Sequence, residues 1–133
     1  MNRNYRPGPK CLERETIKLF GYLTFGSSGA ITAASSSTRG FTVAKVSAKN
    51  GRYTVTLDDY YAQFLNCLAV IEGVADTAFG ANGQICNLRN VAVSSSSLTF
   101  DIQVQDAAGA DAEPASGYKM YIEITLKRVS DTY

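Results

Sequence analysis

From Thr16 onward, apolar and polar residues alternate in short runs that are separated by Gly, Ser, Asn and Asp. Successive side chains of a β-strand point to opposite faces, so this two-residue period predicts strands that bury one face. The clearest run is 118–128, in which the apolar positions are Met120, Ile122, Ile124 and Leu126. No apolar period of helical length separates the runs, which excludes parallel βαβ units.

One hairpin is predicted from the local sequence. Asn50–Gly51 lies between the alternating runs 41–48 and 52–57. Asn-Gly readily adopts the positive φ angles of a two-residue type I′ turn, which joins adjacent antiparallel strands. We therefore expect the two runs to pair as a β-hairpin.

Two segments are less regular. Gly21 interrupts the run 16–25. A glycine inside a strand is typical of a β-bulge, so we expect the phase of the side chains to change there. The segment 58–68 predicts a short helical turn or an irregular crossover that leads into a strand near 67–73.

Residues 1–15 differ from the rest of the chain. They contain Pro7 and Pro9 among Arg and Lys residues, and proline excludes both a regular helix and a central strand. We predict an extended N-terminal arm over 1–15 and a single domain over 16–133. The number and spacing of the short strands are typical of an all-β fold, either an antiparallel β-sandwich or a jelly-roll-like domain.

The sequence argues against an enzyme. It contains no His, which removes the usual general base, and it lacks the GxSxG, GxxxxGK[ST] and GxGxxG motifs. Asp58 and Asp59 are adjacent, so on an extended backbone their carboxylates point in opposite directions and fit turn or capping roles. We therefore predict no catalytic residues, no cofactor and no enzymatic activity.

Metal binding is not indicated either. Cys11, Cys67 and Cys86 have no metal-ligand spacing, and the acidic loop 106–117 does not match the EF-hand pattern. We predict no metal site. Cys67 and Cys86 lie within apolar runs, which favours buried reduced thiols, with a disulfide between them as the alternative.

The remaining candidates are surfaces that bind a partner. A net charge of +1 argues against a dedicated nucleic-acid surface. No leader-like apolar stretch opens the chain and no run approaches the ~20 apolar residues of a membrane span, so we expect cytoplasmic synthesis and no membrane contact. For the arm, the alternatives are a loose tail, docking on a neighbouring subunit, and weak binding of nucleic acid. For the aromatic residues, docking on a partner competes with burial in the core. The candidate partner-contact residues are Tyr5, Arg6, Lys10, Tyr60, Tyr61 and Phe79.

Three stretches resemble small structural proteins of bacteriophage virions. They are NGRYTVTL, the crossover DDYYAQFL that leads into NCLAVIEG, and the ending LTFDIQVQDAAGADAEPASGYKMYIEITLKR. The resemblance implies a β-rich capsid decoration or cement protein that binds the outer capsid surface and stabilises the shell. It also implies a homo-oligomer, often a trimer, that contacts the major capsid protein or other virion proteins and resides in the virion.

Two other functions are consistent with the same residues. The chain has the composition expected of another virion component, such as a tail, connector or fibre-base protein. Its Tyr-rich alternating strands are also compatible with a carbohydrate-binding β-sandwich module.

Overall fold

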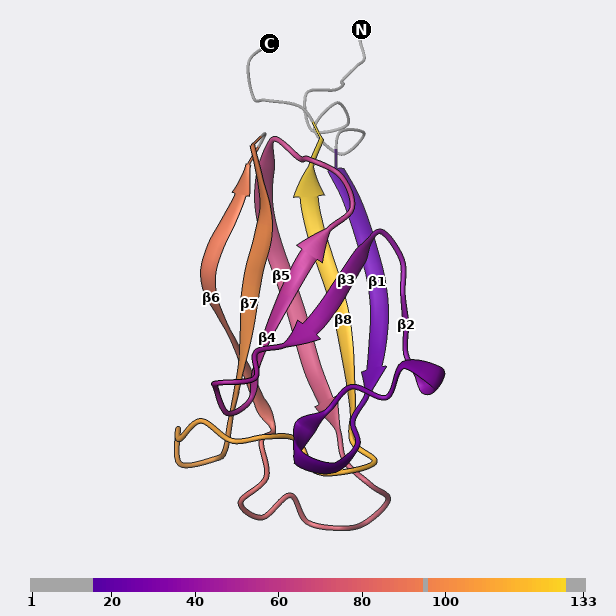
Figure 1. The fold of residues 1–133 in the computed structure, drawn as a ribbon, viewed down its shortest axis with the longest axis vertical. Coiled ribbons are helices and arrows are strands. Elements are labelled where there is room, and N and C mark those ends of the chain that lie inside the picture. Colours follow the sequence, from indigo (N-terminus) through magenta and orange to yellow (C-terminus); the bar gives the residue numbers. More distant parts are fainter. Residues whose placement is uncertain (1–15, 95, 129–133) are drawn as a thin grey trace, which may run out of the picture.

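The structure, a computed structural model, describes residues 16–94 and 96–128. Within them the chain forms two four-stranded antiparallel sheets, ordered β2-β1-β8-β5 and β3-β4-β7-β6, and two short 3₁₀ turns (Figure 1). The strands are β1 (Thr16–Thr24), β2 (Ser37–Thr38), β3 (Phe41–Lys45), β4 (Arg52–Leu57), β5 (Gln63–Glu72), β6 (Ile85–Ser94), β7 (Ser97–Gln105) and β8 (Lys119–Lys127). The turns are η1 (Ser27–Gly29) and η2 (Ala33–Ser35). The predicted all-β class is confirmed, and the predicted arm lies outside the described residues.

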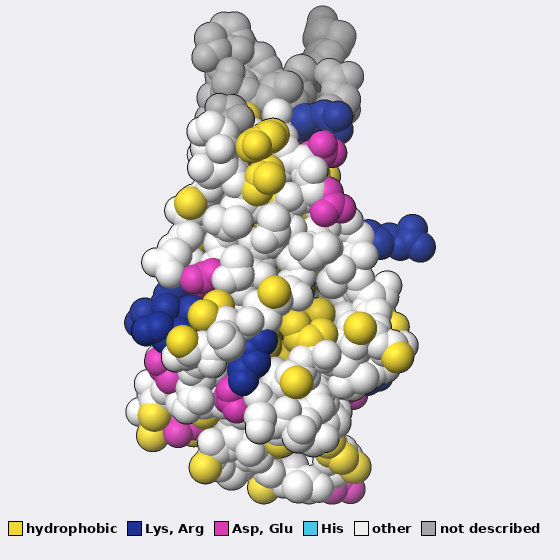
Figure 2. Space-filling view, viewed as in Figure 1, with side chains coloured by type: hydrophobic (Ala, Val, Ile, Leu, Met, Phe, Trp, Pro, Cys, Tyr) yellow, Lys and Arg dark blue, Asp and Glu magenta, His cyan; other side chains and the backbone are white. Residues whose placement is uncertain are grey.

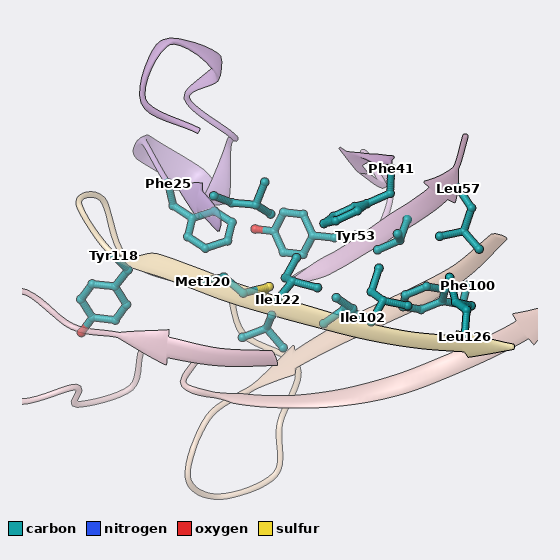
Figure 3. Close-up of a cluster of buried hydrophobic side chains, with 14 of the residues drawn as sticks. Phe25, Phe41, Tyr53, Leu57, Phe100, Ile102, Tyr118, Met120, Ile122 and Leu126 are labelled. Atoms are coloured by element: carbon teal, nitrogen blue, oxygen red, sulfur yellow. The ribbon is translucent and has the colours of Figure 1, made fainter. Parts of the chain in front are cut away.

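The two sheets pack face to face and enclose the core. Strands β7 and β8 show the alternation that the sequence predicts, because their inward side chains are almost completely buried. Two aromatic pairs join the sheets: Phe64 of β5 lies 5.0 Å from Phe100 of β7, and Phe25 lies 5.3 Å from Tyr53, centroid to centroid. Tilted rings at these separations attract one another in addition to burying apolar area. Figure 3 shows the core side chains meeting in the layer between the sheets.

The predicted hairpin is present, but its turn is longer than predicted. Lys45 of β3 pairs with Tyr53 of β4, and the Val46 N–H donates to the Arg52 carbonyl at 2.8 Å, so 47–51 form the loop. Within this loop only Gly51 has a positive φ, of 62°. The prediction of a two-residue type I′ turn is therefore wrong.

The two residues of the predicted turn accept hydrogen bonds from β7 instead. The Gly51 carbonyl accepts a hydrogen bond from the Val104 N–H at 2.8 Å. The Asn50 carbonyl accepts another from the side-chain amide of Gln103, also at 2.8 Å. These tertiary hydrogen bonds extend the contact between β4 and β7. They cannot be predicted from the turn preference of Asn-Gly, which depends only on the local sequence.

The predicted bulge at Gly21 is also wrong. Strand β1 pairs with β8 without interruption along its whole length, and Gly21 lies opposite Ile122. A Cβ at Gly21 would lie 2.8 Å from the Phe41 ring and 2.9 Å from the Thr38 methyl group. The glycine therefore allows β2 and β3 to approach β1 closely, and the side chains of β1 keep one phase.

The bulges lie in the two long edge strands. The register shifts between Phe64 and Asn66 in β5, and between Arg89 and Ala92 in β6. Bulges on edge strands hinder the addition of a further strand from another molecule. Of the two structures predicted for 58–68, the irregular crossover is found, and β5 begins earlier than predicted, at Gln63.

Candidate interaction surfaces

The outer face of the β2-β1-β8-β5 sheet carries a group of exposed apolar side chains. The strand register aligns them in two neighbouring rows, Phe20–Glu123–Leu68 and Tyr22–Tyr121–Val70. We call the five apolar residues of these rows the apolar face: Phe20, Tyr22, Leu68, Val70 and Tyr121. Their exposed fractions run from 38% for Tyr22 to 60% for Phe20. Exposed hydrophobic side chains are usually scattered singly, whereas these five are contiguous, which makes this face a candidate for contact with another molecule.

The apolar face is hollowed. A groove of ≈ 460 Å³ runs over it, with Ser37 and Arg39 at one wall and Leu68 and Val70 at the other. Its base includes Ile122 of β8 and Gly21 of β1. The groove is open to solvent and lined mainly by apolar atoms, which suits a protein surface or the flat face of a small ligand.

Charged groups surround the apolar face. The Lys18 ammonium lies 3.2 Å from a Glu123 carboxylate oxygen, and the Tyr121 hydroxyl donates to Glu72 at 2.7 Å. The hydrogen bond to Glu72 raises the pKa of Tyr121. The Lys119 ammonium lies 6.0 Å from the centre of the Tyr22 ring, a favourable place for a cation.

The outer face of the other sheet is polar. Its side chains bond to one another: Thr54 donates to Asp101 at 2.8 Å and Arg52 donates to Gln103 at 2.9 Å. Asn90 donates to the second oxygen of Asp101 at 2.8 Å. Figure 2 looks onto this side, where side chains of both charges are spread over a largely polar surface that is interrupted by several hydrophobic patches. Among the described residues, the β3-β4-β7-β6 sheet exposes large hydrophobic side chains on its edge strand β6, at Ile85, Leu88 and Val91, whereas the other outer face exposes five that are contiguous.

A second surface lies at the end of the sandwich where β1 begins. Thr16 pairs with Lys127, and the Ala62 N–H donates to the Lys127 carbonyl at 2.9 Å. The start of the described chain, the end of β8 and the crossover between β4 and β5 therefore meet at one end. Tyr60 lies in that crossover and is 58% exposed. We call this the terminal end.

The structure separates the residues that the sequence put forward as partner contacts. Tyr60 is exposed at the terminal end, whereas Tyr61 is buried in the core. Phe79 lies in the loop after β5, at the opposite end, and its ring packs edge-on against Tyr118 at 5.4 Å. The arm residues Tyr5, Arg6 and Lys10 lie outside the described residues.

The acidic residues of the loop before β8 have structural partners. Asp106 accepts hydrogen bonds from the Ala108 and Ala110 N–H groups at 2.9 and 3.0 Å, as in a turn. Glu113 forms an ion pair with Lys45.

Over 16–94 and 96–128 no three His, Cys, Asp or Glu side chains are grouped as metal ligands. In the same ranges no helix has the length and apolar character needed to cross a bilayer.

Cys67 and Cys86 are free thiols that point into the core from the edge strands β5 and β6. Burial raises the pKa of each to about 12, from an ordinary value of 9.0. A thiol with so high a pKa is poorly reactive at neutral pH because the thiolate is the nucleophile. Both cysteines are reduced, so the alternative of a disulfide between them is not found.

These thiols predict an alkaline loss of stability. Between about pH 9 and pH 12 the unfolded chain ionises both thiols while the folded chain keeps them protonated. The free energy of unfolding should therefore fall as the pH rises through this window, and be unaffected by the thiols below it. Urea denaturation at pH 8 and pH 10.5 measures the fall, with the C67S/C86S variant as control. Equal falls in the two proteins would show that the thiols do not contribute.

None of the five residues of the apolar face was predicted as a partner contact from the sequence. The signal was present, because both phases of 16–25 and 63–72 are apolar. In the first segment Phe20 and Tyr22 stand opposite in phase to Leu19 and Leu23. From the sequence, neither Phe20 nor Tyr22 was assigned to an outer face, so the second apolar surface was not predicted.

Comparison with known proteins gives no assignment. No family model matches the sequence, and neither the curated proteins nor the solved structures yield a match.

Proposed function

We propose that the protein is a structural subunit of a bacteriophage virion, a decoration or cement protein that binds the outer surface of the capsid and stabilises the shell. The observation that supports a structural role is the contrast between the two outer faces. One is polar and internally hydrogen-bonded, and the other is apolar and hollowed. A domain with one such face is suited to an assembly in which a protein neighbour covers it. The type of assembly comes from the resemblance to phage virion proteins.

The terminal end is the proposed contact with the capsid. Tyr60 is exposed there, and the basic arm joins the described chain at Thr16 on the same end. Tyr60 provides apolar area for a protein partner, and the basic sequence of 1–15 provides charge. Many copies on a symmetric shell add their weak contacts, so each contact need not be strong.

We expect the full-length protein to cosediment with expanded, undecorated capsids and to raise their rupture temperature. Two changes should each weaken binding about 10-fold or more, namely deletion of residues 2–15 and the substitution Tyr60→Ser. Each removes contact area from the terminal end. Both variants should keep the melting temperature of the isolated domain, because Tyr60 is exposed and the arm has no periodic apolar residues. Ala44→Ser, on the polar outer face, serves as a control that should bind normally. Failure of the wild-type protein to bind expanded capsids would contradict the proposal. Immunolabelling of a tail or connector would show that the protein belongs to another part of the virion.

A carbohydrate-binding role is the second candidate. The observation that favours it is the presence of three aromatic rings in one groove with Glu123 and Arg39, a combination that can stack and hydrogen-bond sugar rings. It predicts saturable binding on a glycan array that is abolished by Tyr121→Ala. Absence of glycan binding together with capsid binding would leave the structural role alone.

A further inference from the structure

The apolar face has the composition of an interface centre. Its five side chains together expose roughly 500 Å², in the upper part of the range for the largest patch on a monomer. The rows on either side of it are polar, namely Lys18–Thr125–Asn66 and Thr24–Lys119–Glu72. An apolar centre with a polar rim is the usual anatomy of a protein–protein interface.

We propose that the apolar face binds the same face of a second copy, in a two-fold symmetric pair whose β8 strands run antiparallel. This pairing deepens the proposed function by naming the neighbour that covers the face. The terminal end of each copy remains free for the capsid.

The charges on the face favour this arrangement. Two identical sheet faces can meet about a two-fold axis along β8 or about one across it. An axis along β8 sets Glu123 against Glu123 of the partner subunit and Lys119 against Lys119 of the partner subunit. Like charges placed opposite one another oppose association.

An axis across β8, between Tyr121 and Glu123, removes these clashes. Each strand then faces the same strand of the partner, running in the opposite direction. Phe20 therefore meets the partner's Tyr22, and Leu68 meets the partner's Val70. Glu123 comes within one row of the partner's Lys119, and the symmetry forms this attraction twice. The chain carries a net charge of only +1, so long-range repulsion between copies is small.

The area is sufficient for a specific dimer. Burial of the apolar face on both copies removes roughly 1,000 Å² of surface, the level at which specific interfaces begin. The polar rim rows and Arg39 add to this area at the margin of the groove.

Light scattering after gel filtration tests the pairing. The full-length protein should have a mass of twice 14.3 kDa at micromolar concentrations. Phe20→Lys should raise the dissociation constant 10-fold or more, because it places two charges in the apolar centre. The new Lys lies opposite Glu123, so the monomer tolerates it. The matched control is Ala44→Lys, which adds the same charge to the exposed polar face and should remain dimeric.

A charge exchange tests the orientation. Glu123→Lys alone should weaken the dimer, and the double variant K119E/E123K should restore it, because the exchange recreates the pairing of opposite charges across the axis. With the β8 strands parallel, like residues face like in every variant and no restoration occurs. Melting temperatures of all variants show that the monomer fold is retained.

Several outcomes would overturn the pairing. They are a monomeric wild-type chain, a trimer, and a dimer that Phe20→Lys leaves intact. A monomer that loses melting temperature with Phe20→Lys would mean that another segment of the same chain covers the face. Capsid binding is measured separately. A dimer that does not bind capsids would contradict only the proposed function, and a monomer that binds capsids would contradict only the pairing.

Discussion

Replacement of Phe100 by alanine is expected to lower the free energy of unfolding by about 4 kcal/mol, the usual cost of removing a buried aromatic side chain. Phe100 is completely buried in β7. Its ring packs against Phe64 of β5 at 5.0 Å and so connects the two sheets. The large-to-small change loses this contact and leaves a cavity that the strands on either side cannot fill.

Phe20→Ala is the matched control, because it removes the same side chain from a site that is 60% exposed. Its effect on the monomer should be below about 1 kcal/mol. Urea denaturation followed by circular dichroism, at a concentration where both variants are monomeric, gives both values. If the two substitutions had similar effects, the core would not lie between the sheets as described.

Replacement of Gly51 by alanine should cost roughly 3–5 kcal/mol, because it combines a strained backbone angle with overpacking. Gly51 has φ of +62°, a region that residues with a side chain rarely adopt. A Cβ there would overlap the carbonyl oxygen of Ala112 and would lie 2.8 Å from that of Val104. Both are backbone atoms, in the loop before β8 and in β7 respectively, so neither can move aside without disturbing the backbone there.

Gly109→Ala separates the two contributions. Gly109 has φ of +88°, but nothing lies within 4 Å of a Cβ built there. This variant should lose only about 1–2 kcal/mol, the cost of the backbone angle. Urea denaturation measures both variants. Equal losses would mean that close packing around Gly51 is unimportant to the fold.

The sequence predicts best where one face of a strand is buried and the other is solvated. In β7 and β8 every second residue is apolar, and all of these residues except Leu98 are buried, together with the polar residues Gln103 and Lys127. The crossover after β4 is one of the two alternatives that the sequence left open for 58–68. In these elements local preference and tertiary packing agree.

The sequence predicts poorly where tertiary contacts override local preference. At Asn50–Gly51 hydrogen bonds to β7 replace the expected two-residue turn. Gly21 permits a close approach by Phe41. From the sequence alone, a glycine within a strand suggests a bulge instead. The apolar face depends on tertiary pairing too, because the register of β1 with β8 sets Phe20 beside Glu123 and Tyr22 beside Tyr121.

We propose that the protein acts through its surfaces, with the apolar face joining two copies and the terminal end contacting the capsid. Electron cryomicroscopy of expanded capsids incubated with the full-length protein tests this most directly. We expect paired β-sandwiches at symmetric positions, joined by the faces that carry Phe20 and Tyr121, with the end near Thr16 toward the capsid. Bare capsids, or sandwiches bound by the polar outer face, would contradict the account.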